Sequence, residues 1–411
     1  MSTPQQKALF ISYDGMTDPL GRSQVIPYLS GLSASGIGIT LMSFEKAERF
    51  EKNEGSVRQL LKEKNITWVP LSYTKKPPIL STLWDIRRMY RAASDIYQKE
   101  KFDIVHCRSY ISALAGLYLK RKYGVRMIFD MRGFWADERL DGGIWPRDKQ
   151  PYKSIYNFFK RKEKEFLQTA DQTISLTANG KKEILSWNIT EKPISITVIP
   201  CCADLEKFST TAIDKELQTS LKDKLGIKDR DVVMSYLGSI GTWYMLDEML
   251  DLFKTSLETH PALKFLFITA DDPSMIYEKA RQKAIPAEKI MVTESPYDKV
   301  ATYLSLSQIA VFFIKPVYSK KASSPTKQGE LMAMGIPLIC NKGVGDVDMI
   351  LEDTNAGIAI EGFSQKDYQY AASRINDLLA MDKEHIKQGA YKYYSLAEGV
   401  KRYKAVYDSL K

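Results

Sequence analysis

Short apolar runs alternate with amphipathic segments through the first half of the chain. The run at residues 7–13, KALFISY, has the length of a buried strand, and residues 23–36 show helical periodicity. A second helical segment, at 109–124, separates two further apolar runs. Strands are predicted at 7–13, 37–44, 102–107, 126–131, 173–177 and 196–200. This order is typical of a doubly wound parallel sheet.

The same alternation starts again beyond residue 208. A polar, Lys-rich segment at 210–231 comes first, and the chain from about 364 to 411 has a helical pattern throughout. Strand-length runs stand between them at 232–238, 263–269, 289–294, 308–314 and 336–340. We predict two α/β domains of similar size that join near residue 208. Ligands are expected beyond the carboxyl ends of the strands, in a cleft between the two sheets.

Composition indicates a folded globular protein in a reducing compartment. The chain has 411 residues, of which 44% are hydrophobic and 27% charged, so a disordered chain or a coiled coil is excluded. The sequence predicts no transmembrane helix and no secretory leader. Its four cysteines form no C-x-x-C pair, which favours a reducing cytoplasm over a disulfide scaffold or a zinc site. We therefore predict a cytoplasmic location.

Positive charge is concentrated in one quarter of the chain. The whole sequence has 59 Lys and Arg against 50 Asp and Glu, a net charge of +9. Residues 71–170 alone hold 21 basic and 11 acidic side chains, a net of +10. Such a patch attracts phosphates, anionic lipids or nucleic acid. A solvated basic surface without a ligand is the alternative.

The turn that precedes the run at 336–340 has the features of a phosphate site. Ser324 is expected to cap a helix whose first residue is Pro325. A helix N-terminus offers free N–H groups and partial positive charge to an anion. Lys327 opposes the helix dipole there, which favours a ligand contact, and Glu330 is placed to accept bonds from a ribose. The alternative is a surface helix on which Lys327 and Glu330 form a weak pair.

A second glycine-bearing turn follows the predicted strand at 232–238. Gly238 and Gly241 allow the backbone to approach an anion closely. A helix is expected to begin near Thr242 and to add its N–H groups. Two glycines are a weak signal, so a tight strand-to-helix turn without a ligand stays open as the alternative.

A third turn, DGMTDPLGR, follows the first predicted strand. Gly15 and Gly21 are expected to make a flexible loop that faces the cleft. Arg22, which comes directly after the second glycine, is a candidate phosphate clamp because its guanidinium can bind two phosphate oxygens at once.

A fourth turn, at 130–143, gathers side chains suited to sugar binding. Arg132, Trp135, Asp137 and Glu138 supply a guanidinium, an aromatic ring and two carboxylates, which fit sugar contacts and proton transfer. His106 ends the predicted strand before it. A catalytic and a structural role are equally compatible with His106 at this stage.

Two segments have the pattern of membrane-surface helices. The residues at 152–166 are aromatic and basic, and the segment at 79–97 has an apolar stripe interleaved with arginines. The stripe consists of Ile79, Leu83, Ile86, Tyr90, Ala93 and Tyr97, and the arginines are Arg87, Arg88 and Arg91. A stripe that faces the protein core is the alternative.

Several common catalytic patterns are missing from the sequence. It contains no Gly-x-Ser-x-Gly, His-Glu-x-x-His or Walker motif, so hydrolase, zincin and P-loop interpretations have no support. Asp346 and Asp348 have the spacing of metal ligands, but this spacing is common, and no metal site is predicted.

The motifs together resemble those of family 4 glycosyltransferases with the GT-B fold, of the bacterial surface-polysaccharide type. SSPTKQGELMAMGIPLIC, at 323–340, is similar to the nucleotide-sugar motif of that family. VIPCCADLEKF, at 198–208, resembles its interdomain segment, and ADQTISLTANGKKEIL, at 170–185, resembles the stretch before that segment. DMRGFWADE, at 130–138, resembles its Arg-Asp-Leu-Trp-Pro-Glu loop.

The resemblance implies a GT-B-like architecture of two Rossmann-like domains facing across a deep cleft. It implies an acceptor-binding domain at 1–208, onto which a last helix at about 392–411 packs back, and a nucleotide-sugar-binding domain at 209–391. It also implies a hexosyltransferase that retains the anomeric configuration and needs neither a metal ion nor a cofactor. The expected donor is a UDP- or GDP-sugar.

The resemblance also implies roles for individual residues. Lys327 would contact the diphosphate and Glu330 the ribose, while Asp137, Glu138, His106 or Arg132 would act on the acceptor. The donor set is Gly15, Gly21, Arg22, Ser239, Gly241, Thr242, Ser324, Pro325, Thr326, Lys327 and Glu330. Two departures stand out: Ala322 replaces the first glutamate of the family's pair, and Arg132 stands where many members carry His-Gly.

The expected partners follow from this assignment. They are a nucleoside-diphosphate sugar, a glycan or polyprenyl-diphosphate-linked acceptor, and an anionic membrane on the inner face of the plasma membrane. No nucleic-acid partner is predicted. A sugar-nucleotide epimerase of the same double-Rossmann plan and a non-catalytic glycan- or nucleic-acid-binding protein are the alternatives.

Overall fold

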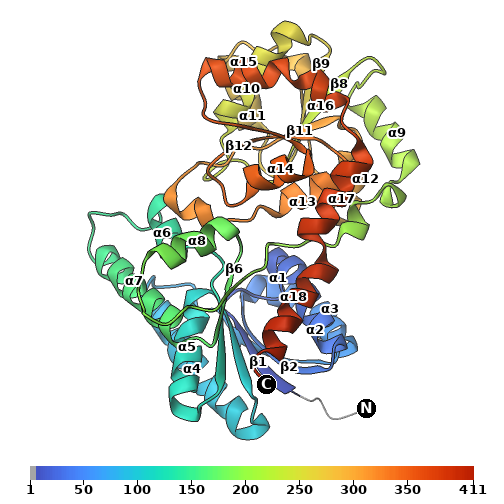
Figure 1. Cartoon of the computed structure of the whole chain (residues 1–411). Helices are drawn as coiled ribbons and strands as arrows, with labels where there is room; N and C mark the ends of the chain where they lie inside the picture. Colours follow the sequence, from blue (N-terminus) through green and yellow to red (C-terminus); the bar gives the residue numbers. More distant parts are fainter. Residues whose placement is uncertain (1–5) are drawn as a thin grey trace. The chain divides into compact units, whose positions relative to one another are not determined.

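The computed structural model describes residues 6–411 and divides the chain into two compact units (Figure 1). The N-terminal domain extends to Cys201 and includes Leu396–Lys411, and the C-terminal domain is Cys202–Ser395. The division comes before residue 208, because Leu205 and Phe208 pack in the core of the C-terminal domain.

The N-terminal domain is built on a parallel sheet with the strand order β3-β2-β1-β4-β5-β6-β7. The strands are β1 (Gln6–Ser12), β2 (Ile37–Glu45), β3 (Ile66–Ser72), β4 (Ile104–Arg108), β5 (Arg126–Asp130), β6 (Gln172–Ser175) and β7 (Ile196–Val198). All five residues of β4 are buried, as expected for a central strand covered on both faces. The strand order reverses between β1 and β4, and ligands of such sheets bind at this switch point.

Helices cover both faces of this sheet (Figure 1). They are α1 (Pro19–Gln24), α2 (Ile26–Ala34), α3 (Ala47–Glu63), α4 (Leu80–Glu100), α5 (Ser109–Tyr123), α6 (Trp135–Asp141), α7 (Tyr152–Thr169) and α8 (Ala178–Ser186). The helix α18 (Leu396–Asp408), at the chain's end, packs beside α2, where Tyr28 and Tyr403 make an edge-to-face contact with ring centroids 5.1 Å apart.

The C-terminal domain has its own parallel sheet, with the order β10-β9-β8-β11-β12-β13. The strands are β8 (Val232–Leu237), β9 (Leu263–Ile268), β10 (Ile290–Thr293), β11 (Ile309–Val311), β12 (Leu338–Asn341) and β13 (Gly357–Ile360). The switch point of this sheet lies between β8 and β11. Both domains therefore have the Rossmann-like architecture that the sequence predicts.

The helices of the C-terminal domain include one in the Lys-rich segment and a series at its end. They are α9 (Lys215–Lys224), α10 (Leu246–Thr259), α11 (Ser274–Gln282), α12 (Val300–Leu304), α13 (Thr326–Ala333), α14 (Val347–Thr354), α15 (Gln365–Ser373), α16 (Ile375–Leu379) and α17 (Lys383–Tyr394). The helical pattern predicted from about 364 to 411 is confirmed, and it is divided among the four helices α15 to α18. Asp382 caps the start of α17 by accepting from the Glu384 N–H, and the extended Ser395 separates α17 from α18.

Two further properties of the fold concern its helices and its cysteines. In the described part of the chain, no helix is long and apolar enough to cross a membrane. Cys107, Cys201, Cys202 and Cys340 are buried thiols that form no disulfide with one another.

Candidate active site

The glycine turn after β8 and the first turn of α13 meet at the switch point of the C-terminal sheet. The Lys327 Nζ donates to the Tyr236 hydroxyl at 3.2 Å and lies 3.6 Å from the centre of the Tyr244 ring. A Cβ built on Gly238 would stand 2.8 Å from this Nζ, and Gly238 has a φ of +122°. A side chain at position 238 would therefore displace the ammonium. The structure brings together two motifs that are 89 residues apart in sequence order.

Aromatic rings explain how a lysine is held at a helix N-terminus. Lys327 is only 8% exposed, and its ammonium faces the π-systems of Tyr244 and Tyr236. Such contacts attract a cation where the helix dipole repels it. Burial lowers the pKa of Lys327 to about 7. Its amine can therefore take up a proton when an anion binds beside it.

Glu330 lies one helical turn beyond Lys327. It is half-buried, and burial raises the pKa of its carboxyl to about 7. The helix begins one residue later than predicted: Pro325, in an extended conformation, occupies the N-cap position, and Thr326 is the first helical residue. The predicted N-cap role of Ser324 is therefore wrong, although Ser324 still lies directly before the helix.

The turn itself is fixed by contacts with neighbouring elements. The Tyr236 hydroxyl donates to the Ser239 carbonyl at 2.5 Å, and the Asp271 carboxylate accepts from the Ile240 N–H. The predicted helix start near Thr242 is wrong, because α10 begins at Leu246 and Thr242 has a φ of +48°. Gly241, with a φ of +96°, keeps the backbone open, since no atom lies within 4 Å of a Cβ built on it.

A second lysine joins this turn. The Lys320 ammonium lies 3.7 Å from the centre of the Trp243 ring, and Lys320 is 6% exposed. Lys320 belongs to the short 3-10 helix Tyr318–Ala322 that precedes α13. Sequence reasoning missed Lys320, Tyr236 and Tyr244 because their pairing depends on contacts across the sheet.

The loop after β1 in the N-terminal domain is tied down. The Glu45 carboxylate accepts from the N–H groups of Met16 and Thr17 at 2.7 and 3.0 Å. A Cβ on Gly21 would lie 2.3 Å from the Gly15 carbonyl oxygen, so the two glycines allow a close chain crossing. The predicted flexible loop is therefore wrong, because the Glu45 carboxylate at the end of β2 fixes its backbone and Gly21 belongs to α1.

Arg22 lies near the end of α1 on the outside of this loop. Its guanidinium is exposed and donates to the Ser56 Oγ at 2.6 Å. The predicted role of Arg22 as a phosphate clamp stays a prediction.

His106 is a core residue. It is 0% exposed, its Nδ1 lies 2.9 Å from the Tyr407 hydroxyl, and its ring centre lies 4.5 Å from that of Phe10. Burial lowers the pKa of His106, which favours the neutral ring. His106 lies in the middle of β4 and contacts Tyr403 and Tyr407 of α18, which favours the structural alternative, and its catalytic role stays a prediction.

Asp137 is also a buried residue. One of its oxygens accepts from the Tyr156 hydroxyl and the other from the Lys160 ammonium, both at 2.8 Å. These bonds join α6 to α7, and Asp137 is 6% exposed. These contacts favour a structural role for Asp137, and its catalytic role stays a prediction.

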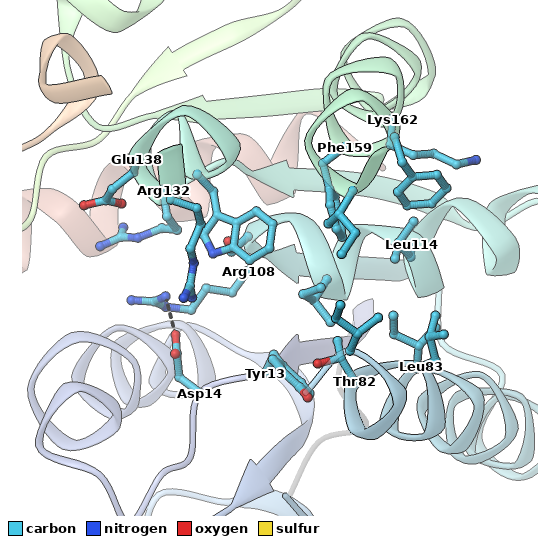
Figure 2. Close-up of a pocket in the computed structure, with 18 of the residues that line it drawn as sticks. Tyr13, Asp14, Thr82, Leu83, Arg108, Leu114, Arg132, Glu138, Phe159 and Lys162 are labelled. Atoms are coloured by element: carbon cyan, nitrogen blue, oxygen red, sulfur yellow. Dashed lines mark hydrogen bonds and ion pairs between the residues drawn. The ribbon is translucent and has the colours of Figure 1, made fainter. Parts of the chain in front are cut away.

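Glu138 and Arg132 have a different environment, because both line a large cavity within the N-terminal domain. Asp14 and Arg108, which flank the switch point between β1 and β4, lie at the same end and form an ion pair of 2.9 Å (Figure 2). Arg132 has a φ of +57°, and Ser109 beside Arg108 has a φ of +70°. Such strained backbone is uncommon and often marks functional sites.

The cavity extends from this polar end between α4, α5 and α7. Its volume is about 1430 Å³, above the roughly 300–1,000 Å³ of most small-molecule sites. The predicted stripe on α4 divides in two. Ile79, Leu83, Ile86 and Tyr90 line the cavity, whereas Ala93 is buried in the core. Most residues that line the cavity thus belong to the segment 71–170, whose net charge is +10.

A metal site is not apparent at either place. Within residues 6–411, no group of three or more His, Cys, Asp or Glu side chains is arranged to hold a metal ion. The predicted independence from metal ions stays a prediction.

Two family models match the chain. The model described as Glycosyltransferase Family 4 matches residues 28–207, and the one described as Glycosyl transferases group 1 matches residues 218–393. The two matches correspond to the two domains.

Two curated relatives are identical to this chain at a quarter or fewer of the aligned residues. UDP-Gal:alpha-D-GlcNAc-diphosphoundecaprenol alpha-1,3-galactosyltransferase of Escherichia coli is 25% identical over 226 residues, which are 53% of this chain and 52% of that protein. The chain thus matches about half the length of this relative. D-inositol 3-phosphate glycosyltransferase of Thermobifida fusca is 21% identical over 352 residues, 82% of this chain and 76% of that protein.

A solved structure has the same fold. Anabaena Alr3699/HepE in complex with UDP superposes with a TM-score of 0.70 at 12% identity, over 98% of this chain and 100% of that one. At this identity the likeness concerns the fold alone.

Proposed function

Because the chain belongs to the glycosyltransferases that join a family 4 domain to a group 1 domain, we propose that it moves a sugar from a nucleoside-diphosphate sugar to a glycan or lipid-linked acceptor. The proposed transfer retains the anomeric configuration, and the transferred sugar is a hexose. UDP is the first donor nucleotide to test, since the E. coli relative is named for UDP-Gal and the HepE structure contains UDP.

The observation that carries this proposal is the Lys327 ammonium beneath the Gly238 turn. Departure of the nucleoside diphosphate leaves negative charge on its outer phosphate. A lysine and helix N–H groups fixed in advance at that position stabilise the charge as it develops. Glu330 is proposed to bind the ribose, and Ser324, Thr326 and Gly241 to approach the phosphates with their backbone.

The acceptor is proposed to bind in the N-terminal domain, at the polar end of the cavity. Glu138 would orient or deprotonate the acceptor hydroxyl, and Arg132 would bind an anionic group beside it. A lipid-linked acceptor agrees with the diphosphoundecaprenol in the name of the E. coli relative. Association with the inner face of an anionic membrane is part of the proposal.

A thermal-shift panel tests the donor site. Wild type, Lys327→Met and the surface control Lys279→Met would be melted with UDP, GDP, CMP and ADP, each with and without a sugar. At about 100 times its dissociation constant, a ligand adds about 2.7 kcal/mol of stability. We expect one nucleotide family to stabilise wild type and Lys279→Met. Lys327→Met should lose most of this shift, since methionine keeps the side-chain volume but not the charge.

Product analysis separates the alternatives. Transfer of sugar to a sugar-diphosphate lipid, in buffer with and without EDTA, is the expected activity, and metal independence predicts equal rates. Interconversion of sugar nucleotides without an acceptor would favour an epimerase. Absence of any nucleotide-dependent shift in folded protein would favour a non-catalytic binding protein.

A further inference from the structure

The cavity of the N-terminal domain is the feature that the donor chemistry does not use. Its walls include the loop after β1, the helices α4, α5, α6 and α7, and residues of the loops beside them. Each helix presents residues at helical spacing. On α4 these are Thr82, Leu83, Ile86 and Tyr90, and α5 contributes Leu114 and Leu117. Figure 2 shows Leu114 and Phe159, of α7, across from Thr82 and Leu83.

The two ends of the cavity differ in chemistry. Figure 2 shows Asp14, Arg108, Arg132 and Glu138 gathered at one end and Leu83 and Leu114 toward the other. Among the described lining residues, six are Arg or Lys and two are Asp or Glu. This lining suits a ligand with an anionic head and a long apolar body.

The anionic head belongs at the strand ends. Arg108 ends β4, Arg132 follows β5, and α5 starts with Ser109 at the same place, so its N–H groups add partial positive charge. At the other end, Arg121 and Lys162 both pair with Glu165, which neutralises part of their charge. A reacting group must lie at the carboxyl ends of the strands, and the chain must then extend away between the helices.

Exposed apolar side chains stand at the start of α4. Leu80, Leu83 and Trp84, in its first turns, are 63%, 57% and 56% exposed. Exposed groups of this size are uncommon on a helix that faces water alone. Of these three, only Leu83 lines the cavity, so Leu83 is the one that would contact a chain held there.

We propose that this cavity binds the isoprenoid chain of a lipid-diphosphate acceptor, with the diphosphate between Arg108 and Arg132. The inference rests on the proposed function and deepens it, because it names the acceptor class and the residues that select it. The apolar helices α4, α5 and α7 hold the chain, while the strand ends hold the reacting sugar.

Chain length is the variable that tests this assignment. Inorganic diphosphate, geranyl diphosphate and farnesyl diphosphate would be titrated into the full chain below their micelle concentrations. Trp135 and Trp145 line the cavity and report binding through their fluorescence. One buried methylene changes affinity about fourfold. We therefore expect farnesyl diphosphate to bind at least about tenfold more tightly than geranyl diphosphate, and inorganic diphosphate to bind most weakly.

Two adjacent residues provide a matched pair of variants. Leu83→Glu puts a carboxylate into the cavity, whereas Trp84→Glu puts one on the equally exposed neighbouring face. Leu83→Glu should abolish the gain from chain length and keep the binding of inorganic diphosphate. Trp84→Glu should keep both. Ile86→Glu, deeper in the cavity, repeats the test should Leu83→Glu fail to fold.

The possible outcomes separate the cavity assignment from the proposed function. Affinity that ignores chain length overturns the cavity assignment, and so does an equal loss in both variants, which would indicate adsorption to the helix surface. The UDP shift measured on the same protein separates the two claims. Nucleotide binding without chain-length dependence refutes the cavity assignment alone. Chain-length dependence without nucleotide binding refutes the proposed transferase and keeps the lipid site.

Discussion

The two domains share an architecture but differ in how each builds its switch point. In the C-terminal domain, two lysines lie against aromatic rings beside a glycine turn. In the N-terminal domain the site is an open cavity of about 1430 Å³ with mostly apolar walls. A cationic site suits one small, highly charged group. A long apolar cavity suits a ligand whose bulk is hydrocarbon.

This difference indicates how a double-Rossmann enzyme divides its task. In the proposed function, the glycine turn and the lysines of the C-terminal domain would bind the nucleoside diphosphate. The helices α4, α5 and α7 would bind the acceptor, and their side chains can change without disturbing the sheet. The variants below separate the two sites, from the largest expected effect to the smallest.

Gly238→Ala should break the C-terminal site alone. The added Cβ would stand 2.8 Å from the Lys327 Nζ, at a φ of +122°. We expect kcat/KM to fall about 10³-fold, because the cation is displaced from the leaving group. Gly241→Ala is the matched control: its φ of +96° is strained, but nothing lies within 4 Å, so about tenfold is expected. Equal losses in both variants would show that Lys327 is not the cause.

Glu138→Gln should affect the N-terminal site alone. We expect kcat to fall about 10²-fold, since the proposed base is lost, with an unchanged affinity for UDP. The neighbouring carboxylate offers the comparison. Asp137→Asn should keep kcat and lower the free energy of unfolding by about 1–3 kcal/mol, because it weakens bonds to Tyr156 and Lys160. Steady-state kinetics and urea unfolding measure these effects. A fall in kcat for Asp137→Asn, with only a loss of stability for Glu138→Gln, would mean that Asp137 is the base and Glu138 the structural residue.

Tyr403→Phe should have the smallest effect, on stability only. Its hydroxyl donates to the buried Asp130 carboxylate at 2.9 Å, so its removal should cost about 1.5–3 kcal/mol. Tyr407→Phe, whose partner is the neutral His106, should cost about 1 kcal/mol. Urea unfolding measures both values. A loss of kcat/KM in either folded variant would contradict the structural assignment of His106 and of α18.

The pattern of apolar runs predicts the inner strands of both sheets but not all of the edges. β3 (Ile66–Ser72) and β13 (Gly357–Ile360) are edge strands that sequence reasoning missed. Pro70 interrupts the first and Gly357 begins the second, so neither has the uninterrupted apolar run of a central strand. Lys327 is predictable because a cation in the first helical turn conflicts with the helix dipole. Glu330 is predictable because it lies one turn further, where an acidic residue can accept bonds from a ribose. Both signals are local.

The rest of the site depends on contacts that a linear pattern does not contain. His106 and Asp137 stand at promising places in the sequence, but α18 and α7 bury them. The stripes on α4, α5 and α7 look like ordinary core faces, and only their convergence makes a cavity. Four of the six residues of the stripe at 79–97 line that cavity, whereas Ala93 is buried in the core, so a core-facing stripe describes only part of it.

The most direct test of the donor site is the number of protons taken up when UDP binds at pH 8. Burial lowers the pKa of Lys327 to about 7, so about nine in ten empty sites hold a neutral amine at this pH. A diphosphate beside Lys327 would raise that pKa, so the amine would take up a proton. The terminal phosphate of UDP is already ionised at pH 8, because such groups have a pKa of about 6, and it adds no proton change of its own.

Calorimetry in two buffers with different ionisation enthalpies measures this uptake. We predict that wild type takes up close to one proton per UDP and that Lys327→Met, which still binds weakly, takes up none. Binding of UDP without proton uptake, or with equal uptake in both proteins, would contradict the contact between Lys327 and the diphosphate.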